Sequence, residues 1–176
     1  MCIRDRDISA TIKGYYALKL AGEDIDAPHM ANARKLILAA GGAERSNVFT
    51  RYALCLFGQA PWKACPVMPV EVMMMPDWFP VTIYKMSYWS RTVVTPLLVI
   101  AALKPHARNP HKVSVQELFK DDPESVTDYH KNTTGKWLGD FFIIVDKILR
   151  KVERFFPKGF RKKSIQSALD LSLIHI

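Results

Sequence analysis

Apolar side chains recur three and four residues apart along most of the chain, which is the spacing of amphipathic α-helices. Glycine follows each of the first three such segments and is expected to end the helix there. Ser46 is the expected N-cap of the third segment, because a serine side chain can accept a hydrogen bond from the first helical turn. The pattern predicts helices over residues 8–21, 28–40 and 47–57.

The second half of the chain combines proline-bounded turns with longer helical patterns. Pro96 lies within the longest apolar stretch and is expected to kink that helix. No strand-like alternation persists, so the fold class is predicted to be all-α, with short helices paired as in solenoids or toroids. The expected elements are a short helix over 70–75, a long helix over 83–103, an extended polar connection over 104–136, an amphipathic helix over 139–156 and a last helix after the basic residues 161–163.

Composition indicates a folded domain without a metal site. The chain has 176 residues, of which 49% are hydrophobic, enough for one domain with a core, and its net charge is +8. Cys55 and Cys65 lie in apolar contexts and lack the spacing of metal ligands, so buried reduced thiols in a cytosolic compartment are expected. No apolar run reaches the roughly 20 residues that a membrane-spanning helix needs.

The two ends of the chain differ in kind from the rest. Residues 1–6 and 171–176 can be encoded by DNA sequences that are reverse complements of each other, which is what a transposon-end adapter leaves on both sides of an insert. We therefore expect residues 7–170 to be genuine protein sequence, and the chain to be an interior piece of a longer protein. The alternative is a natural start and an apolar tail.

Four stretches of the chain carry a family pattern: residues 9–19, 41–51, 66–73 and 87–93. In their order and spacing they resemble the bacterial squalene–hopene cyclases, and the resemblance extends over nearly all of residues 7–170. The resemblance implies a fold of two α/α barrels with the substrate cavity between them. It also implies that this chain is part of the α/α barrel (toroid) that does not carry the catalytic acid.

The chemistry implied for the parent protein is that of an isomerase without a cofactor. Such a cyclase protonates a terminal alkene of squalene and guides a cation cascade to hopene or hopanol. The family's acid is an Asp-Xaa-Asp-Asp motif, which Asp121-Asp122 does not match, and its Gln- and Trp-bearing repeats are also absent from this sequence. We therefore expect no catalytic residue and no metal ligand in this chain. The chain is expected to be an inactive fragment of an active parent protein, and that parent could be a homodimer.

Two aromatic residues are candidates for substrate contact. Carbocations need a wall that excludes water and still stabilises positive charge, and aromatic faces do both. The resemblance implies that Phe49 and Trp89 line the cavity, whereas the sequence alone leaves either ring as a core residue. Arg51 and Arg91 each follow an aromatic residue by two positions, and we expect both in structural ion pairs, with Glu71 as a candidate partner.

The helix expected over residues 139–156 is a candidate membrane-contact element, because one face is apolar and the opposite side is basic. The resemblance implies a monotopic protein that takes squalene from the cytoplasmic face of the membrane. A core-facing helix with a solvated basic side is the alternative. The apolar face comprises Phe141, Val145, Ile148, Leu149, Val152 and Phe156, flanked by Phe142 and Phe155, and the basic side comprises Lys147, Arg150, Lys151 and Arg154.

Two other functions remain compatible with the residues themselves. A non-catalytic helical module could dock to acidic membranes or partner helices through residues 139–163. A basic nucleic-acid binder is the third interpretation, but a nucleic-acid surface does not require the phenylalanines, and no nucleic-acid partner is expected. The resemblance favours the cyclase fragment, with squalene and the membrane interface as partners of the parent.

Overall fold

Helices and short 3₁₀ turns make up all the regular structure that the computed structural model describes, which covers residues 7–79, 82–126, 129, 137–152 and 157–173. No strand occurs in these ranges, so the predicted all-α class is confirmed for them. The chain divides into two units. The first unit is Met1–Pro66 with His106–Lys131, and the second unit is Val67–Pro105 with Asn132–Ile176.

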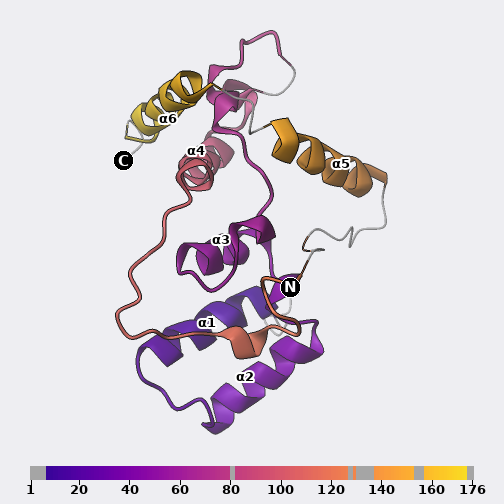
Figure 1. The fold of residues 1–176 in the computed structure, drawn as a ribbon, viewed down its shortest axis with the longest axis vertical. Coiled ribbons are helices and arrows are strands. Elements are labelled where there is room, and N and C mark those ends of the chain that lie inside the picture. The colour runs from indigo at the N-terminus through magenta and orange to yellow at the C-terminus, as the bar shows by residue number, and fades with distance from the viewer. Residues whose placement is uncertain (1–6, 80–81, 127–128, 130–136, 153–156, 174–176) are drawn as a thin grey trace. The chain divides into compact units, whose positions relative to one another are not determined.

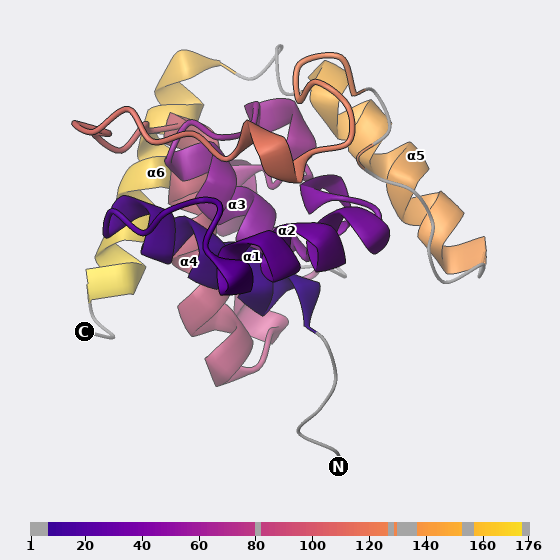
Figure 2. The ribbon, with the colours of Figure 1, turned by 90° about the horizontal axis from the view of Figure 1, so that it is seen from below.

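The first unit contains three α-helices close to the predicted ranges: α1 (Ile8–Leu20), α2 (Pro28–Ala39) and α3 (Val48–Leu56). Asp7 begins α1, because its carboxylate accepts a hydrogen bond from the backbone N–H of Ser9 at 2.8 Å. Helices α1 and α2 lie side by side (Figures 1 and 2). Their fully buried side chains, which include Ile12, Tyr15, Met30 and Ile37, form the core of this unit.

The predicted N-cap of α3 is wrong by one residue. Asn47 caps the helix, because its side-chain oxygen accepts a hydrogen bond from the backbone N–H of Thr50 at 2.8 Å. Ser46 instead ends the preceding 3₁₀ turn η1 (Ala43–Arg45), where its own N–H donates to the carbonyl of Ala43. Ser46 therefore belongs to the preceding turn, and the next residue, Asn47, is the N-cap of α3.

The polar segment after Pro105 is more than a connection. It includes the 3₁₀ turn η5 (Gln116–Leu118), which contacts α2, and Val115 and Leu118 are completely buried in the first unit. Gln59, which follows α3 in the sequence, binds this segment through two hydrogen bonds. Its side chain accepts one from Val115 N–H at 2.9 Å and donates one to the Val113 carbonyl at 3.0 Å. The apolar residues of this mostly polar stretch thus complete the core of the first unit.

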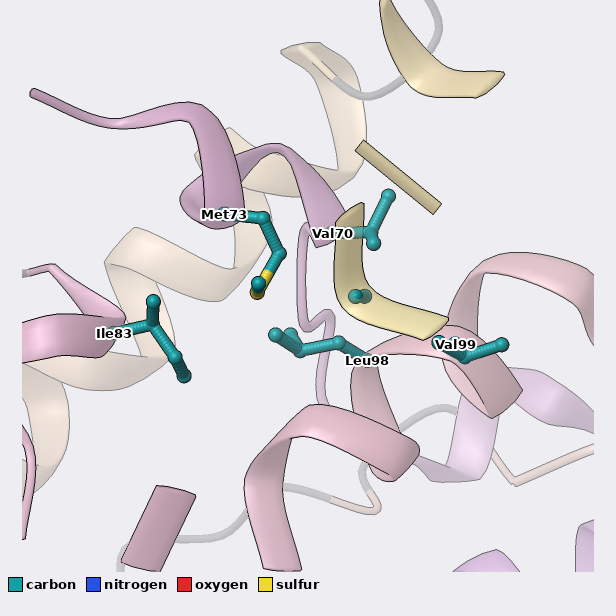
Figure 3. Close-up of a cluster of buried hydrophobic side chains, with 6 residues drawn as sticks. Val70, Met73, Ile83, Leu98 and Val99 are labelled. Atoms are coloured by element: carbon teal, nitrogen blue, oxygen red, sulfur yellow. The ribbon is translucent and has the colours of Figure 1, made fainter. Parts of the chain in front are cut away.

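The second unit contains the 3₁₀ turns η3 (Val70–Met74) and η4 (Ile83–Lys85) and the helices α4 (Tyr88–Leu103), α5 (Trp137–Val152) and α6 (Lys158–Leu173). Helix α6 packs against α4 and η3. Figure 3 shows the hydrophobic cluster between these elements, in which Met73 and Leu98 extend toward each other. Its buried members are Val70, Met73, Ile83, Leu98, Val99 and Ala168. Each large side chain buried here contributes about 1.5–3 kcal/mol.

The long helix predicted over residues 83–103 is divided into two elements. The chain leaves η4 at Met86 in an extended conformation, and α4 begins only after Ser87. Ser87 is the N-cap of α4, and its hydroxyl accepts a hydrogen bond from Ser90 N–H at 3.4 Å. Pro96 lies inside α4. The apolar periodicity runs through the break because Ile83 and Leu98 belong to the same hydrophobic cluster.

Helix α5 begins two residues before the predicted start at 139. The predicted start of the last helix after residues 161–163 is wrong, because α6 begins at Lys158 and includes these cations, one of which, Arg161, is bound to Glu71. The last described residue of α5 is Val152, so residues 153–156 of the predicted membrane helix lie outside the described residues. Helix α6 continues through Leu173, and Leu171 packs against the hydrophobic cluster. The foreign origin of residues 1–6 and 171–176 stays a prediction.

Candidate functional site

The two candidate substrate-contact residues occupy equivalent places in their helices. Phe49 is the second residue after the N-cap Asn47, and Trp89 is the second residue after the N-cap Ser87. In each helix the N-cap side chain accepts a hydrogen bond from the first turn. The capped backbone therefore fixes the position of the Cα atom from which each aromatic side chain extends. The two helices belong to different units, α3 to the first and α4 to the second.

Neither ring is part of a core among the described residues. Trp89 is 79% exposed and Phe49 is 57% exposed. Tyr88 is half exposed, and its ring meets Trp89 edge-on with a centroid separation of 5.7 Å. The assignment of both rings to the substrate cavity stays a prediction.

An arginine lies on the opposite side of each helix from the exposed ring. Residues two apart on an α-helix are separated by about 200° around its axis. Arg51 is accordingly buried while Phe49 is exposed, and Arg91 is partly buried while Trp89 is exposed. In both pairs the aromatic ring therefore points outward and the arginine points inward.

The ion pair expected for Arg51 is not found among the described residues. Its Nη1 instead donates hydrogen bonds to two backbone carbonyls, that of Ala64 at 3.1 Å and that of Tyr129 at 2.8 Å. Burial lowers the pKa of the Arg51 guanidinium from its ordinary value, and nearby thiols and tyrosines act in the opposite direction. Arg51 therefore ties α3 to two other segments of the first unit through carbonyl groups.

Glu71 pairs with a residue that the sequence analysis did not consider. The side chain is 3% exposed, and its Oε1 lies 3.9 Å from Nη1 of Arg161 on α6. Arg161 also donates from Nη2 to the carbonyl of Ala102 at 3.4 Å, near the end of α4. The expected pairing of Glu71 with Arg51 or Arg91 is wrong. Arg161 was missed because it opens a run of cations that is typical of a solvated surface.

Asp146 connects α5 to another segment of the second unit through a hydrogen bond. The carboxylate of Asp146 accepts hydrogen bonds from the backbone N–H of Val67 at 2.6 Å and from Nε of Arg150 at 2.8 Å. The side of α5 that carries Asp146 therefore faces the backbone at Val67. On the other side Trp137, Ile144 and Ile148 are exposed, together with Lys147 and Lys151.

The predicted membrane-contact residues of α5 differ in their surroundings. Ile148, Lys147 and Lys151 are exposed, whereas Val145, Leu149 and Arg150 are partly buried. The side chains of Phe141, Phe142 and Val152 and the whole of Arg154, Phe155 and Phe156 lie outside the described residues. No described helix is long and apolar enough to cross a membrane. Among the described residues, no three His, Cys, Asp or Glu side chains are grouped so as to hold a metal ion.

Two cavities of about 330 Å³ each lie in the first unit. One is polar and includes Gln59 and Asn109, whose side chains are engaged in hydrogen bonds to the backbone. The other is apolar and lies between α1 and α2, next to Ile8 and Leu36. Phe49 lines neither of these two cavities.

Comparison with known proteins gives a consistent result over the whole chain. Residues 3–176 match the family described as the squalene-hopene cyclase N-terminal domain. The chain is 50% identical over 168 residues to the squalene–hopene cyclase of Bradyrhizobium diazoefficiens and 52% identical over 165 residues to that of Zymomonas mobilis subsp. mobilis. A dammaradiene synthase of Dryopteris crassirhizoma is 34% identical over 165 residues.

These alignments cover almost all of this chain but only part of each relative. Each bacterial alignment covers 94% of this chain but 25% of the relative, and the fern alignment covers 92% of this chain and 23% of the relative. The chain thus spans about a quarter of the length of the relatives it matches. The resemblance seen in the sequence is confirmed, and with it the α/α-toroid class of the fold. This chain belongs to the squalene–hopene cyclase family and corresponds to its N-terminal domain.

Proposed function

We propose that the complete protein is a squalene–hopene cyclase, which protonates a terminal alkene of squalene and directs the resulting cation through successive ring closures to hopene or hopanol. The match of residues 3–176 to the cyclase N-terminal domain carries this proposal. The same match favours a fragment of an enzyme over a non-catalytic helical module. In this proposal the chain supplies part of the cavity wall, and the proton comes from an acid motif that its sequence does not contain.

Phe49 and Trp89 are the residues of this chain that we assign to the cavity wall. A carbocation in an apolar pocket is stabilised by an aromatic face by about 0.5–2 kcal/mol, without a nucleophile that would quench it. Both rings are exposed in the described units, and each is held at the start of a capped helix. These features support contacts with an apolar substrate, and the arginines behind the rings act as structural supports.

The test uses the complete protein with the substitution Trp89→Ala. We expect a lower turnover and the release of partly cyclised products, because the missing ring leaves a gap and an unstabilised cation. Trp89→Phe should retain more activity. Trp78→Ala is the matched control, because Trp78 is 80% exposed in the same unit and has no assigned contact with substrate. Unchanged rate and product composition in Trp89→Ala would refute the assignment.

The chain without the rest of the protein should not convert squalene. It contains no Asp-Xaa-Asp-Asp sequence, and the isolated pair Asp121-Asp122 does not replace that motif. The measurement is gas chromatography of squalene incubated with the purified chain in detergent. Any cyclised product at a level above a heat-treated sample would contradict this part of the proposal.

We further propose that α5 contacts the cytoplasmic face of the membrane, from which the complete protein takes squalene. Trp137, Ile144 and Ile148 are separated by seven and four residues, so they share one side of the helix, and all three are exposed. Exposed Lys147 and Lys151 lie beside them. An apolar strip with neighbouring cations is the pattern of a helix that lies in a membrane interface with anionic lipid.

A further inference from the structure

Two thiols lie in contact in the interior of the first unit. The Sγ atoms of Cys55, near the end of α3, and Cys65, just after the 3₁₀ turn η2 (Trp62–Ala64), are 3.4 Å apart. Cys55 is completely buried and Cys65 is 4% exposed, which confirms the buried thiols expected from the sequence. A disulfide requires a sulfur–sulfur distance of about 2.05 Å, so the two atoms must approach by about 1.4 Å to form the bond.

Arg51 organises the backbone around these thiols. It lies one helical turn before Cys55 on α3, and its Nη1 donates to the carbonyl of Ala64, the residue before Cys65. The guanidinium thereby holds the segment that carries Cys65 against the helix that carries Cys55. The Sγ of Cys55 is also within 3.2 Å of the carbonyl oxygen of Pro61, so its position is fixed on both sides.

The surroundings of Cys55 lower the pKa of its thiol. The hydrogen bond from Cys65 lowers the pKa of the Cys55 thiol, and the positive charge of Arg51 acts in the same direction against the effect of burial. The thiolate is the reactive form of cysteine toward peroxides and disulfides. Two cysteines in contact, one of them with a lowered pKa, have the arrangement of an attacking and a resolving cysteine.

We propose that Cys55 and Cys65 are a redox modification site that forms a reversible intrachain disulfide. The oxidant is hydrogen peroxide or oxidised glutathione, which reaches the buried thiols when the segment that carries Cys65 opens locally. With peroxide, the Cys55 thiolate attacks one oxygen, the O–O bond breaks, and Cys55 sulfenic acid and hydroxide form. Cys65 then attacks that sulfur, the S–O bond breaks, and the oxygen leaves as water after taking up a proton. With glutathione, two successive exchanges release two reduced glutathione molecules.

The bridge would join α3 covalently to the segment that follows η2. The ring it closes includes Trp62, whose indole meets Tyr52 edge-on at a centroid distance of 6.3 Å and His106 at 6.2 Å. Closing such a loop restricts the unfolded chain, so the oxidised first unit should resist unfolding more than the reduced one. This inference concerns the first unit alone and does not depend on the cyclase activity.

The decisive experiment measures the equilibrium of the pair in glutathione buffers. Cys2, outside the described residues, is replaced by serine so that only the two thiols remain. We expect the fraction of disulfide, measured by thiol titration after acid quenching, to give an equilibrium constant at least about tenfold larger in the native chain than in concentrated guanidinium chloride, or about 30 mV. Any smaller ratio would overturn the proposal, because the fold would then not bring the thiols together.

Peptide mapping identifies the product. Proteolysis without reductant, followed by mass spectrometry, should show the peptides of Cys55 and Cys65 joined with the loss of two hydrogens. In Cys65→Ser the same treatment should leave Cys55 as a thiol or as a mixed disulfide with glutathione. A product dominated by disulfides between two chains would also overturn the proposal, since it would show that the thiols react separately.

Discussion

Glu71 on η3 and Arg161 on α6 form a buried ion pair in the second unit, with 3.9 Å between Oε1 and Nη1. The carboxylate oxygens have no hydrogen-bond partner among the described residues, so Arg161 is the main compensation for a negative charge removed from water. Arg161 also reaches the carbonyl of Ala102 on α4. One side chain thus links α6 to both elements on which it packs.

Removal of Arg161 should destabilise the second unit more than removal of any neighbouring cation. We expect Arg161→Ala to lower the free energy of unfolding by on the order of 3 kcal/mol, because it leaves Glu71 buried and uncompensated. Lys162→Ala, on the exposed side of the same helix, should change it by less than about 0.5 kcal/mol. Urea denaturation followed by circular dichroism measures both. Equal effects of the two substitutions would show that the pair is not significant for stability.

The N-cap of α3 provides a second stability test. Asn47→Ala should lower the free energy of unfolding of the chain by about 1 kcal/mol, because the N–H of Thr50 loses its acceptor. Ser46→Ala is the matched control and should have little effect, since the Ser46 hydroxyl is buried without a hydrogen-bond partner among the described residues. Thermal unfolding of the two variants checks the difference. A larger loss in Ser46→Ala would mean that the cap assignment is wrong.

The stability of the first unit should depend on the ionisation of Glu117. Burial acts to raise the pKa of this carboxyl, but the hydrogen bonds from Lys19 and Tyr15 outweigh it, so the net pKa lies below the ordinary value of 4.5. A depressed pKa stabilises the folded state above the unfolded-state pKa. That contribution is lost as the pH falls below about 4.5 and through the lower folded-state pKa.

The corresponding variant is Glu117→Gln, which keeps the shape of the side chain and removes its charge. At pH 7 it should be less stable than the original chain. Between pH 7 and pH 4 its free energy of unfolding should fall less steeply, because the titrating group is absent. Denaturation curves at several pH values measure both slopes, and parallel curves for the two proteins would contradict the role assigned to Glu117.

Membrane contact through α5 can be tested in the complete protein by flotation with anionic vesicles. The double substitution Ile144→Asp and Ile148→Asp should release the protein, because it places two charges in the exposed apolar strip. Leu103→Asp is the control, since Leu103 is exposed and apolar but lies on α4. Salt should weaken binding without abolishing it, because Lys147 and Lys151 each add about 1 kcal/mol on anionic lipid. Undiminished flotation of the double variant would place the membrane contact elsewhere.

The sequence by itself determined the helices, because helical periodicity and capping act over a few residues. Helices α1 and α2, for example, lie close to the predicted ranges. The family was also readable from short stretches in a fixed order. Where local signals competed, the prediction failed by small amounts: Ser46 is engaged in the preceding 3₁₀ turn, and the apolar pattern of residues 83–103 spans a break that only the Ser87 cap reveals.

Only the tertiary structure decided which partner each buried polar side chain has. Arg51 was recognised as a residue that needs a partner and Glu71 as a candidate partner, but the carbonyl of Tyr129 and the guanidinium of Arg161 come from distant parts of the chain. The same holds for the contact between Cys55 and Cys65 and for the exposed positions of Phe49 and Trp89. Periodicity states which side of a helix is apolar, whereas the choice between core and surface depends on which segments pack against that side.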